Sequence, residues 1–280
     1  MRRPVITVLG LCGRSVFMKV DHFHHPGETV HASSIYIEPG GKGYNQAVAA
    51  ARLGAEVHFF ASCGDDEDGK ACIDFLISEG IHPHIQVVGI PTAFASILTD
   101  KDGSNQVTVY RGSADELSAA FLEAYENIIA ESDIVLLNFE VPDEAIDATC
   151  RITRKYGIKT ILNPAPAHKC SEEYLNQFYC ITPNQSEAEA LGYETKREVI
   201  TLGGDGALLI EDGVRTHLTA LQTPVKDTTG AGDCFNGALA VAIAEKEPLL
   251  KAVQFAQKAA AWSVAHDYVM PSLPYRNQIE

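Results

Sequence analysis

The sequence predicts an α/β protein with a mainly parallel sheet, helices on both of its faces, and a small second sheet. Two observations lead to this prediction. Short apolar, β-rich runs alternate with longer helical patterns along the 280 residues, and such alternation is typical of βαβ units. Two stretches, 15–38 and 93–110, are rich in β-forming residues and contain no helical pattern. We expect those two stretches to form the small sheet.

The strands of the main sheet are expected where short apolar runs occur. They are Val5–Gly10, Glu56–Ala61, Ile134–Asn138, Thr160–Asn163, Tyr179–Thr182 and Val199–Leu202. The first run is too short for a signal peptide and no small-residue cleavage pattern follows it, so a buried strand is the better interpretation.

The expected helices show longer amphipathic or Ala-rich patterns between and after these strands. They are Tyr44–Leu53, Asp68–Glu79, Ser118–Ala130, Asp143–Tyr156, Ala231–Glu245 and Lys251–Ala265. A hairpin is expected in the second helix-free stretch, where residues 100–103 (DKDG) separate the β-rich runs 95–99 and 106–110. The Asp-Gly pair accepts the positive φ of a tight turn.

Composition limits the classes of partner. The net charge of -15 argues against a nucleic-acid partner, because phosphates attract basic surfaces. No apolar run approaches the roughly 18 residues that a membrane span needs. The seven cysteines are scattered and form no CxxC pair, which favours reduced thiols in the cytoplasm over disulfides or a zinc site. A phosphorylated small molecule stays compatible, because local backbone amides can hold phosphate on an acidic protein.

The most informative segment is Asp227–Asp233 (DTTGAGD), which leads into a helical run. Its small residues let backbone N–H groups point into open space, and the helix start adds a partial positive charge. Together they form an anion hole suited to a transferring phosphoryl group. Asp233 lies at the helix mouth, where a carboxylate can accept a proton from an attacking hydroxyl. Taken alone, a segment of this kind is more often a glycine-rich helix cap.

Residues 39–47 (PGGKGYNQA) lead into an Ala-rich helix. The segment is neither a Walker A loop nor a GxGxxG motif. Its small residues allow a ligand to approach the helix start closely, and Lys42 and Asn45 can form hydrogen bonds with sugar hydroxyls. A tight turn with a helix cap is the alternative.

Two polar segments follow later strands. In residues 182–189, Asn184 and Glu187 share one face of a helical turn, where their oxygens can organise water around Mg²⁺. Residues 201–206 (TLGGDG) form a Gly-rich loop after a strand, which is where α/β proteins place ligands. A capped helix and an ordinary loop are the alternatives for these two segments.

These four segments, in this order, resemble the ribokinase-like (PfkB) family of carbohydrate kinases. The likeness runs from about Val5 to Pro274, and the segments 163–166 (NPAP) and 26–29 (PGET) also look like ribokinase. The resemblance implies a single domain over residues 1–280 with a doubly wound α/β core. It also implies a β-sheet lid made of segments 15–38 and 93–110, and pairing of such lids in a homodimer.

The resemblance also implies roles for particular residues. Asp233 would be the catalytic base, and the amides of Gly230, Ala231 and Gly232 would form the anion hole. The sugar pocket would contain Asp233 and the positions Gly13, Ser15, Gly41, Lys42, Asn45 and Glu140. ATP would face Asn184, Thr201, Gly203, Gly206 and Gln257.

Metal positions follow from the same resemblance. Glu187 would serve Mg²⁺ through water. Many members of the family bind a monovalent cation such as K⁺ beside the anion hole, and the matching positions are Asp227, Thr229, Ser263, His266, Tyr268 and Ser272. Tyr268 stands where ribokinase-like chains tend to have Gly.

Two departures from the family pattern bear on substrate and fold. Near the N-terminus the family carries an Asn and an Asp that bind sugar hydroxyls, but this chain has Gly13 and Ser15, separated by Arg14. The loss of a carboxylate removes a bidentate acceptor for a diol, which argues against ordinary ribose. One hypothesis is that Arg14 reads an anionic group of the substrate, and the alternative is that Arg14 lies on the surface of the lid. Only 17 residues separate Asn184 from Thr201, where the family fits a further helix and strand. Either the chain is trimmed there or residues are missing from the sequence.

The sequence therefore predicts an ATP- and Mg²⁺-dependent phosphotransferase acting on a hydroxymethyl group of a sugar or sugar-like substrate. A nucleoside kinase or a sugar-acid kinase of the same family is one alternative. A sugar-binding regulator without catalytic activity is another, because the pocket positions near the N-terminus are altered. An oxidoreductase is disfavoured because no GxGxxG motif follows the first strand.

Overall fold

Residues 2–280, which the computed structural model describes, form two separate β-sheets. The strands of the main sheet are β1 (Val5–Leu9), β4 (Glu56–Gly64), β5 (His82–Val88), β8 (Ile134–Asn138), β9 (Lys159–Asn163), β10 (Cys180–Ile181), β11 (Arg197–Thr201), β12 (Ala207–Glu211) and β13 (Val214–Leu218). They lie in the order β13-β12-β11-β10-β9-β8-β1-β4-β5. Pairing is parallel from β5 to β11 and antiparallel for β12 and β13, which confirms the predicted mainly parallel sheet.

The helices connect these strands or follow them. They are α1 (Lys42–Arg52), α2 (Glu67–Ser78), α3 (Ala119–Ala124), α4 (Glu126–Ile129), α5 (Asp143–Tyr156), α6 (Glu172–Leu175), α7 (Gln185–Leu191), α8 (Ala231–Ala244) and α9 (Leu249–Ser263). Short 3-10 turns occur at 112–116, 203–205 and 276–278. Within residues 2–280, no helix combines the length and the apolar character needed to cross a membrane.

Helices cover both faces of the main sheet. In β8, Ile134 and Leu136 pack into a hydrophobic cluster with α1, α8 and α9. Their neighbours Val135 and Leu137 pack into a second cluster with α3 and α5. Successive residues of an extended strand point to opposite faces, so one apolar run supplies both layers. This arrangement confirms the doubly wound core that the resemblance implied.

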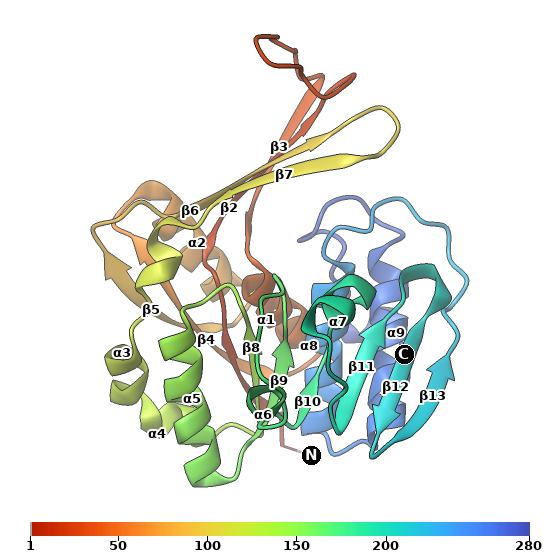
Figure 1. The fold of residues 1–280 in the computed structure, drawn as a ribbon. Coiled ribbons are helices and arrows are strands. Elements are labelled where there is room, and N and C mark those ends of the chain that lie inside the picture. Colours follow the sequence, from red (N-terminus) through yellow and green to blue (C-terminus); the bar gives the residue numbers. More distant parts are fainter. Residues whose placement is uncertain (1) are drawn as a thin grey trace.

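The small sheet consists of β2 (Gly13–Lys19), β3 (Ser34–Gly40), β6 (Ala93–Thr99) and β7 (Asn105–Tyr110), in the order β3-β2-β6-β7. In Figure 1 it stands away from the body that holds the main sheet. The predicted hairpin is present, because β6 and β7 pair antiparallel. In its turn Gly103 has φ 81°, and the Asp100 carboxylate accepts hydrogen bonds from the N–H groups of Asp102 and Ser104.

Several elements differ from the prediction. The strands β5, β12 and β13 were not expected from the apolar runs, although the β12–β13 turn contains Asp212-Gly213 with φ values of 49° and 83°. That Asp-Gly pair is a hairpin signal of the kind used for residues 100–103. The predicted helix 118–130 is divided into α3 and α4, because Tyr125 departs from helical geometry between them with φ -107° and ψ 19°.

The segment between Asn184 and Thr201 contains only α7 and β11. Residues 192–196 connect them directly, and Gly192 ends α7 in the left-handed conformation. β11 still pairs with β10 on one side and β12 on the other. The main sheet is therefore continuous without the further helix and strand that the family fits there.

Candidate active site

Asp233 lies in the first turn of α8, on the side of the small sheet. Gly230 precedes the helix with φ 76°, a conformation that favours glycine. A Cβ at Gly230 would lie 2.6 Å from Cγ1 of Val269, whereas nothing lies within 4 Å of a Cβ at Gly232. The first amides of a helix have no partner within the helix and carry its partial positive charge. The Ala231 N–H donates to the Thr228 carbonyl oxygen over 3.3 Å, so the turn leaves the N–H groups of Gly230 and Gly232 for a ligand beside the carboxylate.

Two side chains of α1 hold the Asp233 carboxylate. Asn45 Nδ2 donates to Asp233 Oδ2 over 2.8 Å, and Gln46 Nε2 donates to Asp233 Oδ1 over 3.1 Å. Only 8% of Asp233 is exposed. Burial raises the pKa of Asp233, while the charge of Lys42 and the two amide donors lower it. The N-terminal ends of α1 and α8 thus meet at one buried carboxylate.

Glu140 approaches the same place from the end of β8. Its Oε2 accepts a hydrogen bond of 2.6 Å from the N–H of Lys42. Burial raises the pKa of Glu140 to about 7, the Lys42 charge lowers it, and the charge of Asp233 raises it. Gly41 has φ 126°, and a Cβ there would lie 2.2 Å from the Leu11 carbonyl oxygen, so only glycine fits between β1 and α1. Gly41, Lys42, Glu140 and Asp233 therefore form one group.

The predicted sugar-binding positions Gly13 and Ser15 lie on β2, in the small sheet. Ser15 pairs with Glu38 and Gly13 with Gly40 in the small sheet. Arg14 forms an ion pair of 2.6 Å with Asp68 of α2. Because neighbouring residues of a strand point to opposite faces, Arg14 and Ser15 do not share a face of this sheet.

A cavity of about 500 Å³ lies on the other side of the α8 N-terminus. All five predicted ATP positions line it: Asn184, Thr201, Gly203, Gly206 and Gln257. Ala231 and Gly232 also line it, so the start of α8 borders this space. Part of the remaining lining belongs to no motif, and no sequence signal identified it: residues 220–223, Val225, Ala260, Ala261 and Val264. The Gln257 amide is itself bound, because Nε2 donates to the Leu218 carbonyl oxygen over 3.0 Å.

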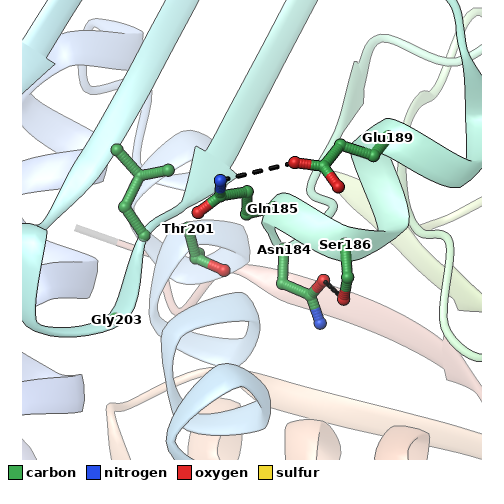
Figure 2. A pocket seen from close by; sticks show the side chains of 7 residues that line it. Asn184, Gln185, Ser186, Glu189, Thr201 and Gly203 are labelled. Atoms are coloured by element: carbon green, nitrogen blue, oxygen red, sulfur yellow. Dashed lines mark hydrogen bonds between the residues drawn. The ribbon is translucent and has the colours of Figure 1, made fainter.

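A smaller hollow adjoins this cavity at the start of α7 (Figure 2). Asn184 caps α7, accepting a hydrogen bond from the N–H of Glu187, while the Glu187 carboxylate accepts one from the N–H of Asn184. Figure 2 shows the Asn184 side chain bonded to Ser186, and Gln185 directed toward Glu189. Burial raises the pKa of Glu187, whereas its bond to Asn184 and the Lys42 charge lower it. The oxygen atoms of the Asn184 and Glu187 side chains thus lie at the edge of the cavity of about 500 Å³.

The predicted cation positions come from two segments that the structure brings together. Asp227 accepts hydrogen bonds from the N–H groups of Thr229 (2.9 Å) and Tyr268 (3.1 Å). The Ser263 and Ser272 hydroxyls are 2.9 Å apart, while His266 Nδ1 contacts the Trp262 carbonyl oxygen. Tyr268 has φ 62°, a left-handed conformation that glycine adopts more readily than other residues. In residues 2–280, no three His, Cys, Asp or Glu side chains are arranged to hold a metal ion.

Comparison with known proteins identifies the class of enzyme. The family model described as "pfkB family carbohydrate kinase" matches residues 4–276. The ribokinase of Haemophilus influenzae is 36% identical over 297 residues, covering 99% of this chain and 97% of that protein. The ribokinase of Bacillus subtilis is 35% identical, covering 98% of each. The family model and these relatives define a ribokinase-like, ATP-dependent carbohydrate kinase.

Solved structures agree with this class. The Thermotoga maritima ribokinase is 33% identical with a TM-score of 0.88, covering 99% of this chain and 98% of that one. The Arabidopsis thaliana ribokinase, solved with ribose and ATP, is 26% identical with a TM-score of 0.87, covering 100% and 98%. The chain belongs to the pfkB family of carbohydrate kinases.

Proposed function

We propose that this kinase transfers the γ-phosphoryl group of ATP to a hydroxymethyl group of a sugar, with Asp233 as catalytic base. The observation that carries the proposal is the position of Asp233 directly after Ala231 and Gly232, which line the cavity of about 500 Å³. Its carboxylate also accepts a hydrogen bond from Asn45 and lies near the charges of Lys42 and Glu140. The cavity would hold the ATP, and the acceptor sugar would bind near Lys42, Asn45 and Glu140. A hydroxyl placed there meets the carboxylate and the phosphoryl group together, which is the geometry that general base catalysis requires.

Each group has a role in this reaction. Asp233 accepts the proton of the attacking hydroxyl. Burial raises the pKa of Asp233, whereas the Lys42 charge and the two amide donors lower it and so favour the ionised form. The amides of 230–232 stabilise the charge on the transferring group. Asn45 and Glu140 bind and orient sugar hydroxyls. Burial works to lower the pKa of Lys42, but Asp233 and Glu140 raise it, so Lys42 keeps its charge beside the acceptor.

Two metal ions complete the proposal. Asn184 and Glu187 provide the hard oxygen atoms that Mg²⁺ and its waters prefer, and they adjoin the proposed ATP cavity. When bound, Mg²⁺ neutralises phosphate charge. The segments 227–229 and 263–272 meet where the Tyr268 N–H donates to Asp227, and the Asp227 carboxylate there would help to hold K⁺. The seven free thiols support a location in the cytoplasm.

The acceptor is proposed as a small sugar-like molecule. The ribokinase names of the relatives suggest ribose. Gly13 and Ser15 instead provide one hydroxyl where the family has an amide and a carboxylate, and this favours the alternative of a nucleoside or sugar-acid acceptor. A panel of sugars, sugar acids and nucleosides with ATP and Mg²⁺ tests the proposal, using the proton-coupled ³¹P spectrum of each product. A triplet marks phosphate on a CH₂ group. A product phosphorylated at a ring hydroxyl refutes transfer to a hydroxymethyl group.

Arg14→Ala tests whether that arginine reads an anionic substrate. Because Arg14 is already paired with Asp68 at 2.6 Å, we expect kcat/KM for neutral sugars and for sugar acids to change equally, by less than about threefold, as is usual for a partly exposed ion pair. Steady-state kinetics with one acceptor of each kind gives the comparison. A loss of tenfold or more confined to the acids would instead show that Arg14 contacts their carboxylate.

The small sheet is proposed to act as a lid and as a dimer interface. Its edge strands expose large apolar side chains: Ile35 is 63% exposed, Val107 54% and Val109 50%. Exposed apolar residues on open sheet edges need cover, and a second copy of the lid provides it. We expect sedimentation at micromolar concentration to show a dimer, and Val107→Lys to shift it toward monomer. A wild-type monomer under those conditions contradicts the interface.

A further inference from the structure

Besides its bond to Asp233, Gln46 has a buried contact with Asn163 to which the proposed reaction gives no role. Its side chain is fully buried, and Nε2 lies 3.1 Å from Asp233 Oδ1 and 3.1 Å from Asn163 Oδ1. An amide nitrogen has two hydrogens, so these two acceptors use both. Within residues 2–280, Gln46 Oε1 has no hydrogen-bond partner. The position of the Gln46 side chain is therefore set by the bonds of its nitrogen to Asn163 and Asp233.

The orientation of Asn163 is fixed in turn by the strand beyond it. Asn163, at the end of β9, donates from Nδ2 to the Thr182 carbonyl oxygen over 2.9 Å. A carbonyl oxygen can only accept, so the nitrogen of Asn163 faces Thr182 and its oxygen faces Gln46. Gln46 must then present its own nitrogen to Asn163, and the remaining hydrogen points at Asp233. The Thr182 carbonyl oxygen thus determines the donor and the acceptor in each hydrogen bond of the series from Thr182 through Asn163 and Gln46 to Asp233.

The same series reaches the anion hole. The Thr182 hydroxyl donates to Asn236 Oδ1 over 2.5 Å, and Asn236 Nδ2 donates to the Gly232 carbonyl oxygen over 2.9 Å. Thr182 and Asn236 are buried as well. The carboxylate of Asp233 and the peptide of Gly232 are therefore joined by hydrogen bonds through the ends of β9 and α1 and the first turns of α8.

We propose that Gln46 and Asn163 are positioning residues that fix the Asp233 carboxylate relative to the anion hole. This inference rests on the proposed role of Asp233 as base. Misplacing a reacting group by about 1 Å can cost on the order of 100-fold in rate, and hydrogen bonds are electrostatically stronger in a buried site than in water. Asn45 alone bonds only one carboxylate oxygen, so Gln46 is needed to prevent rotation of the carboxylate about its own axis.

Other charges face Asp233 and must be considered with it. Lys42 on α1 lowers the pKa of Asp233. The charges of Glu140, after β8, and Glu187, on α7, interact with those of Lys42 and Asp233. Cys234 follows Asp233 in α8. Since these groups stay in place when Gln46 changes, a shift in the titration of Asp233 reports the lost amide donor.

The test compares Gln46→Leu with Gln46→Glu, which keeps the shape but replaces the donor with an acceptor, and with Val48→Ala. Val48 is a fully buried apolar residue of the same helix, so its truncation is the control for loss of stability alone. We expect both Gln46 variants to lower kcat about 10- to 100-fold and to change the sugar KM less than about threefold. The acid limb of the kcat profile should move to higher pH. Val48→Ala should lower Tm and leave that limb unchanged.

A second measurement needs neither ATP nor turnover. In protein with ¹³C-labelled Asp carboxyl groups, the signal of Asp233 is the one that Asp233→Asn removes. Its titration midpoint should rise by about one unit or more in Gln46→Leu, because a donor to the ionised form is lost. An unchanged midpoint, or a Gln46→Leu variant that behaves as Val48→Ala does, overturns the positioning role. If the wild type shows no turnover while the midpoint shifts as expected, the kinase proposal fails and the hydrogen-bond role stands.

Discussion

Asp233→Asn is expected to lower kcat by about 10²- to 10⁴-fold, the usual contribution of a general base. The amide cannot accept the hydroxyl proton, while the shape of the site is kept. The sugar KM should change little, because Lys42, Asn45 and Glu140 remain. The variant should also unfold at an equal or higher temperature, since burial raises the pKa of Asp233 and a neutral side chain avoids the cost of a buried charge. Coupled ADP release and a thermal melt measure both quantities.

Glu198→Gln is the matched control for this change. Glu198, on β11, is another buried carboxylate with a pKa raised by burial, and it accepts a hydrogen bond from the N–H of Thr195 in the connection before that strand. We expect this variant to retain wild-type kcat. If Asp233→Asn also keeps more than about a tenth of wild-type kcat, the loss is below what general base catalysis provides and Asp233 is not the base.

Gly230→Ala should damage the site through its backbone. The residue has φ 76°, and its new Cβ would lie 2.6 Å and 3.1 Å from the two Cγ atoms of Val269. A left-handed conformation costs an L residue about 1–2 kcal/mol, and the contact forces α8 or residue 269 to move. Because the anion hole is the first turn of that helix, we expect kcat to fall on the order of 100-fold, together with a lower Tm.

Two comparisons separate the contact from the φ penalty. Gly89→Ala places a Cβ in open space without positive φ and should leave kcat and Tm near wild type. In the double variant Gly230→Ala/Val269→Ala the crowding is removed, so part of the kcat should return while the φ penalty stays. Full kcat in the single variant would show that the position of this turn does not matter for transfer.

The sequence predicted which residues lie at the candidate site better than it predicted the contacts between them. The predicted ATP positions, from Asn184 to Gln257, line one cavity because the loops after parallel strands open at the same edge of a sheet. Asn184 caps α7, Thr201 is the last residue of β11, and Gly203 and Gly206 lie in the turn after that strand. Arg14 shows the limit: its ion pair with Asp68 crosses from the small sheet to α2, and no motif marks such a contact.

The hydrogen bonds that link Gln46 to Asn236 also could not be predicted from the sequence. Gln46 and Asn163 are each part of a quoted motif, but they are 117 residues apart, and only the fold places their amides together. The fold class could be predicted because β-rich and helical runs alternate along the chain. The antiparallel hairpin β12–β13 was missed. Its strands are short, and the Asp212-Gly213 turn between them was the local signal available.

The most direct test of the account is ADP release by the wild-type protein with ATP and Mg²⁺ over the panel of sugars, sugar acids and nucleosides, repeated with Asp233→Asn. The account predicts that at least one acceptor stimulates ADP release and that the Asp233 variant loses this stimulation. If no acceptor does so although calorimetry shows that a sugar binds, the chain is a sugar-binding protein and not a phosphotransferase.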